Sequence, residues 1–411
     1  MTMKNYLIGL NLIITLSSLP LLAMSCSEEI TRPEVTTPLM PDLGPEGTGG
    51  SVGLSNVTRT TICQAGTNAD VYRIPSIITA RDGSLLVFCE WRHESWRDKS
   101  YTDIVVRRST DDGKTWSQAQ NLTGSINNGE FAYMDPTPVV DEQTGEIFLF
   151  CTRWNELDTD ATKNRAFRIS STDHGVTWSF PKDVSDEIIV PGLYSGGFGP
   201  GHGITIREGQ HAGRLVVITR QSNGSRNTGY AIYSDDHGKT WHYGASTNGA
   251  ESQIAESGAN RLYLNLRQGE SRYTTTSVDG GESWSPAMID NSLPVVSGGC
   301  QASVLGTGNN MVFYCGPKGG VRTDTNDNRS GLTLFRSAVG GSAWTRKQEL
   351  YTLASGYSDM TLLQDGRLAI VFEAGPEQGF TLNAQRPAGW MRLDLIICPK
   401  EITDYDYWFE Q

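Results

Sequence analysis

The chain has 411 residues (45.0 kDa), of which 37% are hydrophobic and 19% charged, so it can bury a large core, and disorder and coiled coil are excluded. A formal net charge of −12 leaves no basic field to hold a phosphate backbone, so nucleic acid is not expected as a partner. The 45 Gly, 10 Trp and 15 Tyr residues favour many short strands joined by tight turns. An all-β enzyme or binding protein is therefore the starting expectation.

The N-terminal segment has the features of a targeting signal. Lys4 precedes an apolar run over residues 6–22, and small residues precede Cys26. This order is typical of a secretory signal and resembles the lipobox of bacterial lipoproteins, in which Cys26 becomes the lipidated first residue. An ordinary cleaved signal and an uncleaved anchor are the alternatives, although the run is short and polar for a membrane span.

We therefore expect residues 1–26 to form the signal and residues 27–56, which contain several prolines and a Gly-Thr-Gly-Gly stretch, to form a flexible tether. The protein is then exported to the bacterial cell envelope, in the periplasm or at the outer membrane or cell surface. It would meet a membrane only through the lipid at Cys26.

Six further cysteines, an even number in an exported chain, raise the question of disulfides: Cys63, Cys89, Cys151, Cys300, Cys315 and Cys398. A hairpin folded between Thr307 and Gly308 would set Cys300 opposite Cys315 and allow a disulfide there. Free thiols buried in strands are the alternative.

An eight-residue pattern, Ser-x-Asp-x-Gly-x-Thr-Trp, recurs along the chain. Intact copies begin at Ser109, Ser171 and Ser234; a fourth, from Ser277, carries Ser for Thr, and a decayed fifth, from Ser337, has Val in place of Asp. The pattern predicts a hairpin turn in which Asp caps the backbone two residues on, Gly takes a positive φ, and Trp packs beneath the strands. A calcium loop is rejected because the further oxygen ligands and the Glu that it needs do not recur.

A second repeat, a turn followed by an apolar strand, begins at Gly83, Gly145, Gly213, Asn260, Asn310 and Gly366. Six units over residues 57–411 give about 59 residues each, which suits a four-stranded blade, and helical periodicity is absent. We predict a six-bladed β-propeller over residues 57–411, in which a strand near residues 58–63 pairs with the run 390–397. Boxes of this kind occur in propellers with unrelated functions, so they identify only the scaffold.

Three arginines lie in different predicted blades, in polar or glycine-rich contexts: Arg73 in Tyr-Arg-Ile-Pro, Arg267 in Leu-Asn-Leu-Arg and Arg329 in Asn-Arg-Ser-Gly. Together with the motifs around Arg92, Asp98, Asp103, Asp135, Glu251 and Tyr357, they resemble the bacterial exo-α-sialidases (neuraminidases). The resemblance covers nearly the whole chain after about residue 60. Its most specific elements are Arg-Ile-Pro, the box repeats, and the ordered series of three Arg, Glu and Tyr.

The resemblance implies how the substrate's carboxylate is bound. Arg73, Arg267 and Arg329 would surround it, since planar guanidinium groups bind a carboxylate bidentately and stay charged at physiological pH. Glu373 matches the acid that pairs with and orients Arg73, which lowers the cost of holding that charge in a partly desolvated pocket.

The resemblance also implies a tyrosine nucleophile. Tyr357 would attack, because a neutral phenol avoids the repulsion that a carboxylate meets at the anionic anomeric centre of sialic acid, and Glu251 would accept its proton. Asp98 would be the acid/base for the departing oxygen. We expect Asp103, which heads a strand, to support the fold instead, and Glu256 is the alternative to Glu251.

Further residues would contact the sugar ring. Arg92 and Asp135 match positions that contact the 4-substituent and the N-acetyl amide, and a rim salt bridge is the alternative for Arg92. Trp154 is the candidate wall for the acetyl methyl group, unless it only packs a blade. His202, in Gly-Pro-Gly-His-Gly-Ile, either lines the cleft or simply belongs to a glycine-rich turn.

The function implied by the resemblance is a retaining exo-α-sialidase that releases terminal sialic acid from glycoproteins, oligosaccharides and gangliosides, without a metal or an organic cofactor. A trans-sialidase on the same fold, with a sugar hydroxyl or the substrate's own 7-hydroxyl as acceptor, is one alternative. A propeller glycosidase with two carboxylates would not require three Arg and a Tyr. A non-catalytic glycan-binding propeller would need the arginines but not Tyr357, Glu251 and Asp98.

Overall fold

The structure of the protein is a computed structural model that describes residues 57–64, 71–93, 95, 97–155, 160–247, 249–319, 329–344, 346–375 and 392–403. Contacts within the chain divide it into two units, residues 1–49 and 50–411, and every described residue belongs to the second. The predicted signal with Cys26 and the predicted tether lie outside the described residues, and both stay predictions.

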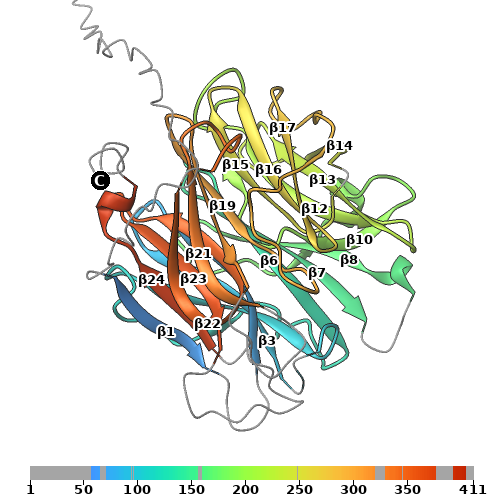
Figure 1. Cartoon of the computed structure of the whole chain (residues 1–411). Helices are drawn as coiled ribbons and strands as arrows, with labels where there is room; N and C mark the ends of the chain where they lie inside the picture. The colour runs from blue at the N-terminus through green and yellow to red at the C-terminus, as the bar shows by residue number, and fades with distance from the viewer. Residues whose placement is uncertain are drawn as a thin grey trace, which may run out of the picture. The chain divides into compact units, whose positions relative to one another are not determined.

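The described part of the chain is almost entirely β-structure (Figure 1). Its helical elements are one four-residue α-helix, α1 (Ser185–Ile188), and 3-10 turns at Ala161–Lys163 and Lys400–Ile402. Among these described residues, no helix has the length and apolar character needed to cross a lipid bilayer. The prediction of an all-β fold is confirmed.

One sheet holds eight strands that follow one another in the chain: β2 (Val71–Thr79), β3 (Leu85–Arg92), β4 (Thr102–Ser109), β5 (Gln120–Asn121), β6 (Phe131–Val140), β7 (Ile147–Asn155), β8 (Arg165–Ser171) and β9 (Lys182–Asp183). A single parallel pair, Thr102 with Ala132, joins β4 to β6. The other pairs of this sheet are antiparallel, so it consists of two antiparallel groups.

Two smaller antiparallel sheets follow. The first contains β10 (Tyr194–Phe198), β11 (Ile204–Thr205), β12 (Leu215–Ser222), β13 (Asn227–Ser234) and β14 (His242–Ser246). The second contains β15 (Ser252–Gly258), β16 (Arg261–Gln268), β17 (Ser271–Ser277) and β18 (Met288–Ile289).

The last sheet joins the two ends of the described chain. Its strands are β19 (Ser303–Gly308), β20 (Met311–Pro317), β21 (Ser330–Ser337), β22 (Arg346–Leu362), β23 (Leu368–Ala374), β24 (Arg392–Ile397) and β1 (Thr58–Gln64). The 17-residue strand β22 pairs with β21 through its first part and with β23 through its second.

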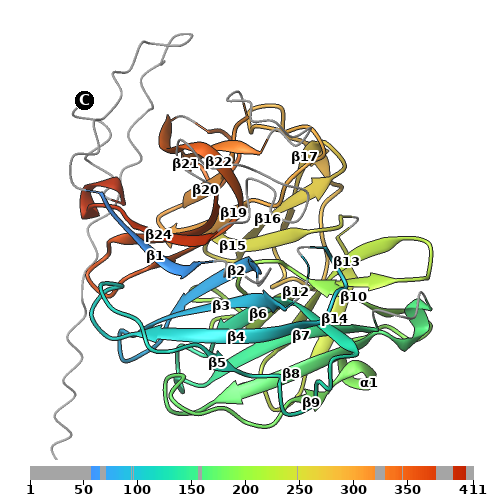
Figure 2. The same cartoon turned by 90° about the horizontal axis from the view of Figure 1, so that it is seen from below.

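The predicted pairing of the N-terminal and C-terminal strands is confirmed. β1 runs antiparallel to β24, from Thr58 opposite Ile397 to Gln64 opposite Arg392, and Figures 1 and 2 show the blue β1 beside the red β24. Trp390, where the predicted run begins, lies outside the described residues. The number of blades stays a prediction.

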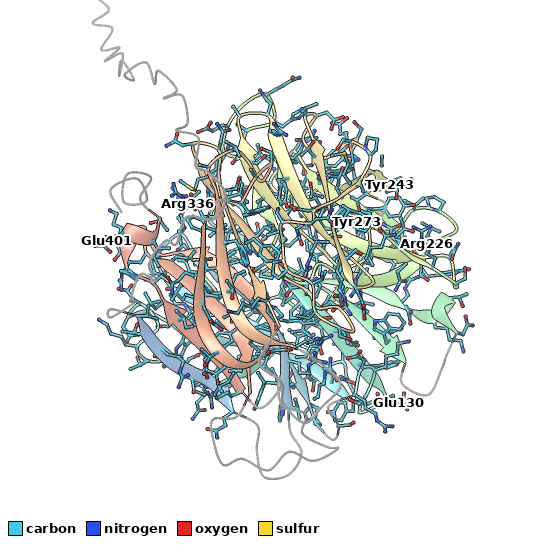
Figure 3. The ribbon with its side chains drawn as sticks, viewed as in Figure 1. Glu130, Arg226, Tyr243, Tyr273, Arg336 and Glu401 are labelled. Atoms are coloured by element: carbon cyan, nitrogen blue, oxygen red, sulfur yellow. The ribbon has the colours of Figure 1, made fainter. Side chains whose placement is uncertain are left out.

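The second repeat is also confirmed, because each of its six apolar runs forms a strand: β3, β7, β12, β16, β20 and β23. β20 and β23 are buried along their whole length, since other strands or sheets cover both of their faces. Side chains of the described strands fill the spaces between neighbouring sheets (Figure 3).

The box that begins at Ser234 shows how the first repeat folds. Thr240 donates its backbone N–H to Asp236 Oδ1 (2.9 Å) and its hydroxyl to Asp236 Oδ2 (2.6 Å), while the N–H of Gly238 reaches Ser234 Oγ (2.9 Å). The expected Asp cap two residues on is therefore wrong. It lies four residues on, because His237 and Gly238 both take positive φ angles (61° and 75°) and turn the chain back.

The predicted disulfide between Cys300 and Cys315 is wrong, because all six described cysteines are free and buried. The hairpin turns at Asn309 and Asn310, whose φ angles of 50° and 59° suit a tight two-residue loop, two residues later than expected. Cys315 consequently faces Ser303, and Cys300 lies before β19. The alternative of free, buried thiols is the correct one.

Candidate active site

β-Bulges interrupt three strands where predicted site residues lie: Arg73 in β2, Asp135 in β6 and Tyr357 in β22. Ile74 and Asp135 have φ angles of 51° and 58°, which residues with a Cβ rarely adopt, and a proline follows each of them. A bulge changes the direction of a side chain relative to the regular pleat. The bulges thus explain how these three side chains leave the alternation of their strands.

Tyr357 and Glu251 are joined by a short hydrogen bond. The phenol hydroxyl donates to Glu251 Oε1 at 2.6 Å, and Arg267 Nη1 donates both to Glu251 Oε2 (2.6 Å) and to the Tyr357 oxygen (2.9 Å). Burial, and then the charge of Glu251, raise the pKa of Tyr357 well above its ordinary value. The phenol is therefore neutral at physiological pH and needs a base to become a nucleophile.

The charge of Glu251 suits it to be that base. Burial opposes its ionisation, but Arg267 and Arg220 outweigh burial and lower its pKa. Glu256, the alternative to Glu251, instead accepts the backbone N–H groups of Arg207 (3.0 Å) and Glu208 (2.9 Å). Of the two acids, Glu251 is the one bonded to Tyr357.

The three predicted triad arginines converge on the Tyr357 ring. The guanidinium carbons of Arg73 and Arg329 lie 5.6 and 5.4 Å from its centroid, and Arg267 bonds its oxygen. Arg267 and Arg329 also donate to the carbonyls of Gly298 and Gly299, respectively, at 2.9 Å. Three cations from β2, β16 and the residue before β21 thus surround one point, as the bidentate capture of an anion requires.

Glu373 in β23 is fully buried and holds several groups of the site. It accepts Nε of Arg73 (3.1 Å) and the backbone N–H groups of Ile74 (3.0 Å) and Tyr357 (3.2 Å). It therefore fixes the backbone at two of the three bulges as well as the Arg73 side chain.

Asp98 lies on the loop between β3 and β4 and meets two arginines. Its Oδ1 lies 2.9 Å from Arg92 Nη1 and 3.4 Å from Arg73 Nη1, and its side chain is 68% exposed. Burial of part of the carboxyl raises its pKa, but Arg92 and Arg73 outweigh this and lower the pKa overall. Asp98 is an exposed carboxylate at the edge of the arginine cluster.

Asp103, expected to support the fold, is buried among polar groups of neighbouring segments. It accepts hydrogen bonds from Thr123 (2.7 Å), His93, Asn121 and Asn127 (3.0 Å each). These four contacts tie β4 to His93 after β3, to Asn121 of β5 and to the segment that follows β5.

Arg92, a predicted sugar contact, is fully buried and donates to Glu90 Oε2 through Nε (2.8 Å) and Nη2 (2.5 Å). The other oxygen of Glu90 accepts the backbone N–H of Asp135 (3.0 Å). Arg92 is therefore part of a buried network, and its Nη1 also pairs with the exposed Asp98 at the edge of the cluster. Sequence reasoning missed Glu90.

Asp135 has a second partner that sequence reasoning missed, Arg220 of β12, which bonds Asp135 Oδ2. Burial raises the pKa of Asp135 to about 7; Arg220 opposes this rise, whereas Glu90, Glu251 and Asp98 add to it. Glu251 Oε1 lies 3.9 Å from the other terminal nitrogen of Arg220.

The repeat itself contained a signal for the missed residues. Seven positions after the turn residue that starts each unit of the second repeat stand Glu90, Thr152, Arg220, Arg267, Pro317 and Glu373. Four of these six are charged although they end apolar strands, and all four lie in the cluster described above. A charged residue at this position of the repeat therefore indicates a side chain of the site.

The predicted positions of Trp154 and His202 have different outcomes. The Trp154 ring lies 4.2 Å beneath the ammonium of Lys99, the neighbour of Asp98, so it is beside the Asp98 loop. His202 is buried and bonds Asp359 Oδ1 through Nδ1 (2.8 Å), next to Gln253 (3.0 Å). His202 thus belongs to a polar network of the core rather than to an open cleft.

The cluster contains equal numbers of basic and acidic side chains. It holds five arginines and five carboxylates: Arg73, Arg92, Arg220, Arg267, Arg329, Glu90, Asp98, Asp135, Glu251 and Glu373. In the described ranges, no three His, Cys, Asp or Glu side chains are grouped so that they could hold a metal ion. The arrangement can bind an anion, shift a phenol proton to a carboxylate and present a second carboxyl from the edge.

Comparison with known proteins places these features in a family. Residues 88–370 match the family described as BNR repeat-like domain. The chain is 30% identical over 329 residues to a sialidase of Micromonospora viridifaciens, a match that covers 74% of this chain and 50% of that protein. It is 31% identical over 261 residues to a sialidase of Clostridium perfringens, covering 58% and 67%.

Among solved structures, the fold is similar to the Hadza microbial sialidase Hz136, with a TM-score of 0.68 and 28% identity over 76% of this chain and 66% of that one. The chain therefore spans about half the length of the Micromonospora protein and about two thirds of the other two.

Proposed function

The chain belongs to the sialidase family of BNR repeat-like proteins, and we propose that it is a retaining exo-α-sialidase that hydrolyses terminal sialic acid from glycoconjugates. The observation that carries this proposal is the contact between Tyr357 and Glu251, with Arg267 bonded to both. A glycan-binding module would need the arginines but not a phenol held 2.6 Å from a charged acid.

Substrate binding would begin with the carboxylate of sialic acid. Arg73, Arg267 and Arg329 would hold it, since each guanidinium can direct two parallel N–H groups at one anion. The attraction on the anion comes from these nearest arginines, because salt screens the net negative charge of the chain beyond about 8 Å.

The first chemical step would transfer the sugar to the enzyme. The Tyr357 oxygen forms a bond to the anomeric carbon, its proton passes to Glu251 Oε1, and the bond from that carbon to the leaving oxygen breaks. Asp98 gives its proton to the leaving oxygen, so the aglycone departs as a neutral alcohol. Arg267 is bonded to both Tyr357 and Glu251, so it stabilises the negative charge whether that charge lies on the Glu251 carboxylate or on the Tyr357 oxygen.

The second step would release the sugar. Asp98, now a carboxylate, takes a proton from water as the water oxygen bonds to the anomeric carbon. The bond to the Tyr357 oxygen breaks, and Glu251 returns its proton to the phenol. Two displacements at one carbon give net retention.

Asp98 would become protonated when the substrate binds. Arg92 and Arg73 favour the carboxylate of Asp98 in the free enzyme. A bound sialic acid carboxylate adds a negative charge and engages Arg73, so it raises the proton affinity of Asp98. Binding therefore prepares the acid that the first step needs.

The rest of the sugar would contact the Asp135 side of the site. Asp135 would accept the N–H of the acyl amide, Arg92 would lie towards the 4-substituent, and Trp154 would contact the acyl methyl group.

The fold would be a six-bladed propeller, since separating β4 from β6 and dividing the last sheet at β22 leaves six antiparallel groups. Lipidation at Cys26 and location in the cell envelope stay predictions from the N-terminal sequence.

The test is to incubate the protein with sialyllactose and follow the products by proton NMR. The proposal predicts that free sialic acid appears first as its α-anomer, that Tyr357→Phe abolishes release, and that Tyr351→Phe, on the same strand, preserves it. First release of the β-anomer, or full activity of Tyr357→Phe, would contradict the proposal. Transfer products or an anhydro sugar would instead identify a trans-sialidase.

A further inference from the structure

Arg220 lies between two acids of the candidate site and takes no part in the steps above. One of its terminal nitrogens bonds Asp135 Oδ2, and the other lies 3.9 Å from Glu251 Oε1, the same oxygen that accepts the Tyr357 hydroxyl. Its side chain is only 12% exposed. A guanidinium that joins a sugar-side acid to the base of the nucleophile can influence both.

We propose that Arg220 is a positioning residue that ties Asp135 to Glu251 and keeps Glu251 ionised, with Oε1 directed at Tyr357. This inference rests on the proposed function. Arg220 would act through Glu251, and it has no contact with the reacting atoms of its own.

The charges around Arg220 and Glu251 support this role. Arg220 faces Asp135, Glu251, Tyr357 and, as a like charge, Arg267. Glu251 faces Arg267, Arg220 and Tyr357, and its charge raises the pKa of Asp135. Without Arg220, Asp135 would lose the arginine bonded to it, and Glu251 would keep Arg267, which already divides one nitrogen between Glu251 and Tyr357.

The backbone next to this pair has no room for a side chain. A Cβ at Gly197 of β10 would lie 2.1 Å from Arg220 Nη2 and 2.5 Å from Asp135 Oδ2, and the φ angle there is 127°. The bulged strand β10 thus has a glycine where the Arg220–Asp135 pair passes. This fit is independent of the charges and indicates a built arrangement.

The experiment is the pH profile of kcat/KM on an aryl sialoside for wild type, Arg220→Gln and Arg220→Lys. Loss of the positive charge raises the proton affinity of Glu251, so its base form is lost at higher pH. We expect the acidic limb of Arg220→Gln to move up by about one pH unit. At neutral pH, where Glu251 is still ionised, we expect kcat/KM to fall about tenfold or more because Glu251 Oε1 is no longer held towards Tyr357.

Arg220→Lys covers the case in which the Gln variant does not fold. Its single ammonium cannot reach two acids through separate nitrogens, so kcat should fall about tenfold while KM and the melting temperature stay close to wild type. The matched control is Arg214→Gln: Arg214 stands just before β12, is buried, and pairs with Asp235 and Glu282. The Arg214→Gln variant should be less stable than wild type, and the acidic limb of its pH profile should stay at the wild-type position.

A folded Arg220→Gln whose acidic limb is unmoved would overturn the inference, as would an equal shift in Arg214→Gln or an unchanged kcat in Arg220→Lys. An inactive wild type would be a different result, because it would overturn the proposed function and this inference together.

Discussion

Glu373 accepts the backbone N–H of Tyr357 at 3.2 Å while it also holds the Arg73 side chain at 3.1 Å. A Cβ at Gly356 would lie 2.2 Å from Glu373 Oε2, so the residue before the proposed nucleophile has to be small. One buried acid therefore holds both Arg73, a proposed ligand of the substrate carboxylate, and the backbone of Tyr357, the proposed nucleophile.

Replacing Glu373 by Gln should therefore reduce both stability and catalysis. The change leaves buried Arg73 without its main counter-charge, which typically costs about 3 kcal/mol or more. Chemical denaturation measures this loss, and steady-state kinetics on sialyllactose should show a lower kcat together with a higher KM. Wild-type kinetics in a folded Glu373→Gln variant would show that the acid positions nothing in the site.

Arg329→Ala should weaken substrate binding. The carboxylate loses a charged partner worth about 2 kcal/mol, so KM should rise about 30-fold. The control is Arg226→Ala, an exposed arginine after β12 that Figure 3 labels at the margin of the molecule, and it should behave as wild type. An unchanged KM in Arg329→Ala would remove Arg329 from the carboxylate site.

The loss of activity in Asp98→Asn should depend on the leaving group of the substrate. An acid that protonates the departing oxygen contributes about 10²- to 10⁴-fold for an alkoxide leaving group and little for an acidic phenol. We expect kcat/KM to collapse on sialyllactose and to change little on an aryl sialoside with an acidic phenol.

Asp103→Asn is the matched control for Asp98. It should lower the melting temperature, because Asp103 accepts four hydrogen bonds from neighbouring segments, and it should affect both substrates equally. Equal losses on the two substrates in Asp98→Asn would argue against its role as the acid.

The turns of the box repeat should contribute to stability. Burial opposes ionisation of Asp236, but hydrogen bonds from Thr240 and Ser234 outweigh it and lower its pKa from 3.8 to about 2. Asp236→Asn loses the charged acceptor of the Thr240 hydroxyl, and we expect a loss of about 1 kcal/mol in denaturant unfolding.

The pH dependence of that loss follows from the direction of the pKa shift. A folded-state pKa below the unfolded value gives a contribution that is complete above pH 3.8 and disappears as the pH falls towards 2. The difference between wild type and Asp236→Asn should therefore be constant from about pH 5 to 8. Asp186→Asn, in an exposed ion pair, should have almost no effect.

Local patterns in the sequence predicted much of the fold. The six apolar strands and the positions of the box turns follow from periodicity and repeats, which depend on neighbouring residues, whereas the pairing of β1 with β24 followed from the expected closure of a ring. The hairpin near Cys315 was misplaced by two residues, because the apolar run did not show that Asn309 and Asn310 would take the turn. A shift of two residues was enough to exclude the disulfide.

The candidate site was predicted through resemblance for the residues that would touch the sugar, and incompletely for those behind them. Glu90 and Arg220 were missed because a single charged residue at the end of an apolar strand resembles a surface residue. Their importance depends on which strands the fold brings together, as with Arg220 between Asp135 and Glu251. His202 was left open for the same reason, since only the fold shows its bond to Asp359.

The most direct test of the account is to trap the sugar on the enzyme. A 2,3-difluoro sialic acid with a fluoride leaving group slows the second step more than the first, so the covalent intermediate should accumulate and can be digested with trypsin. The account predicts one added sugar on peptide 348–367, with fragmentation that places it on Tyr357 rather than on Tyr351. A label on Asp98, Glu251 or any other carboxylate would contradict it.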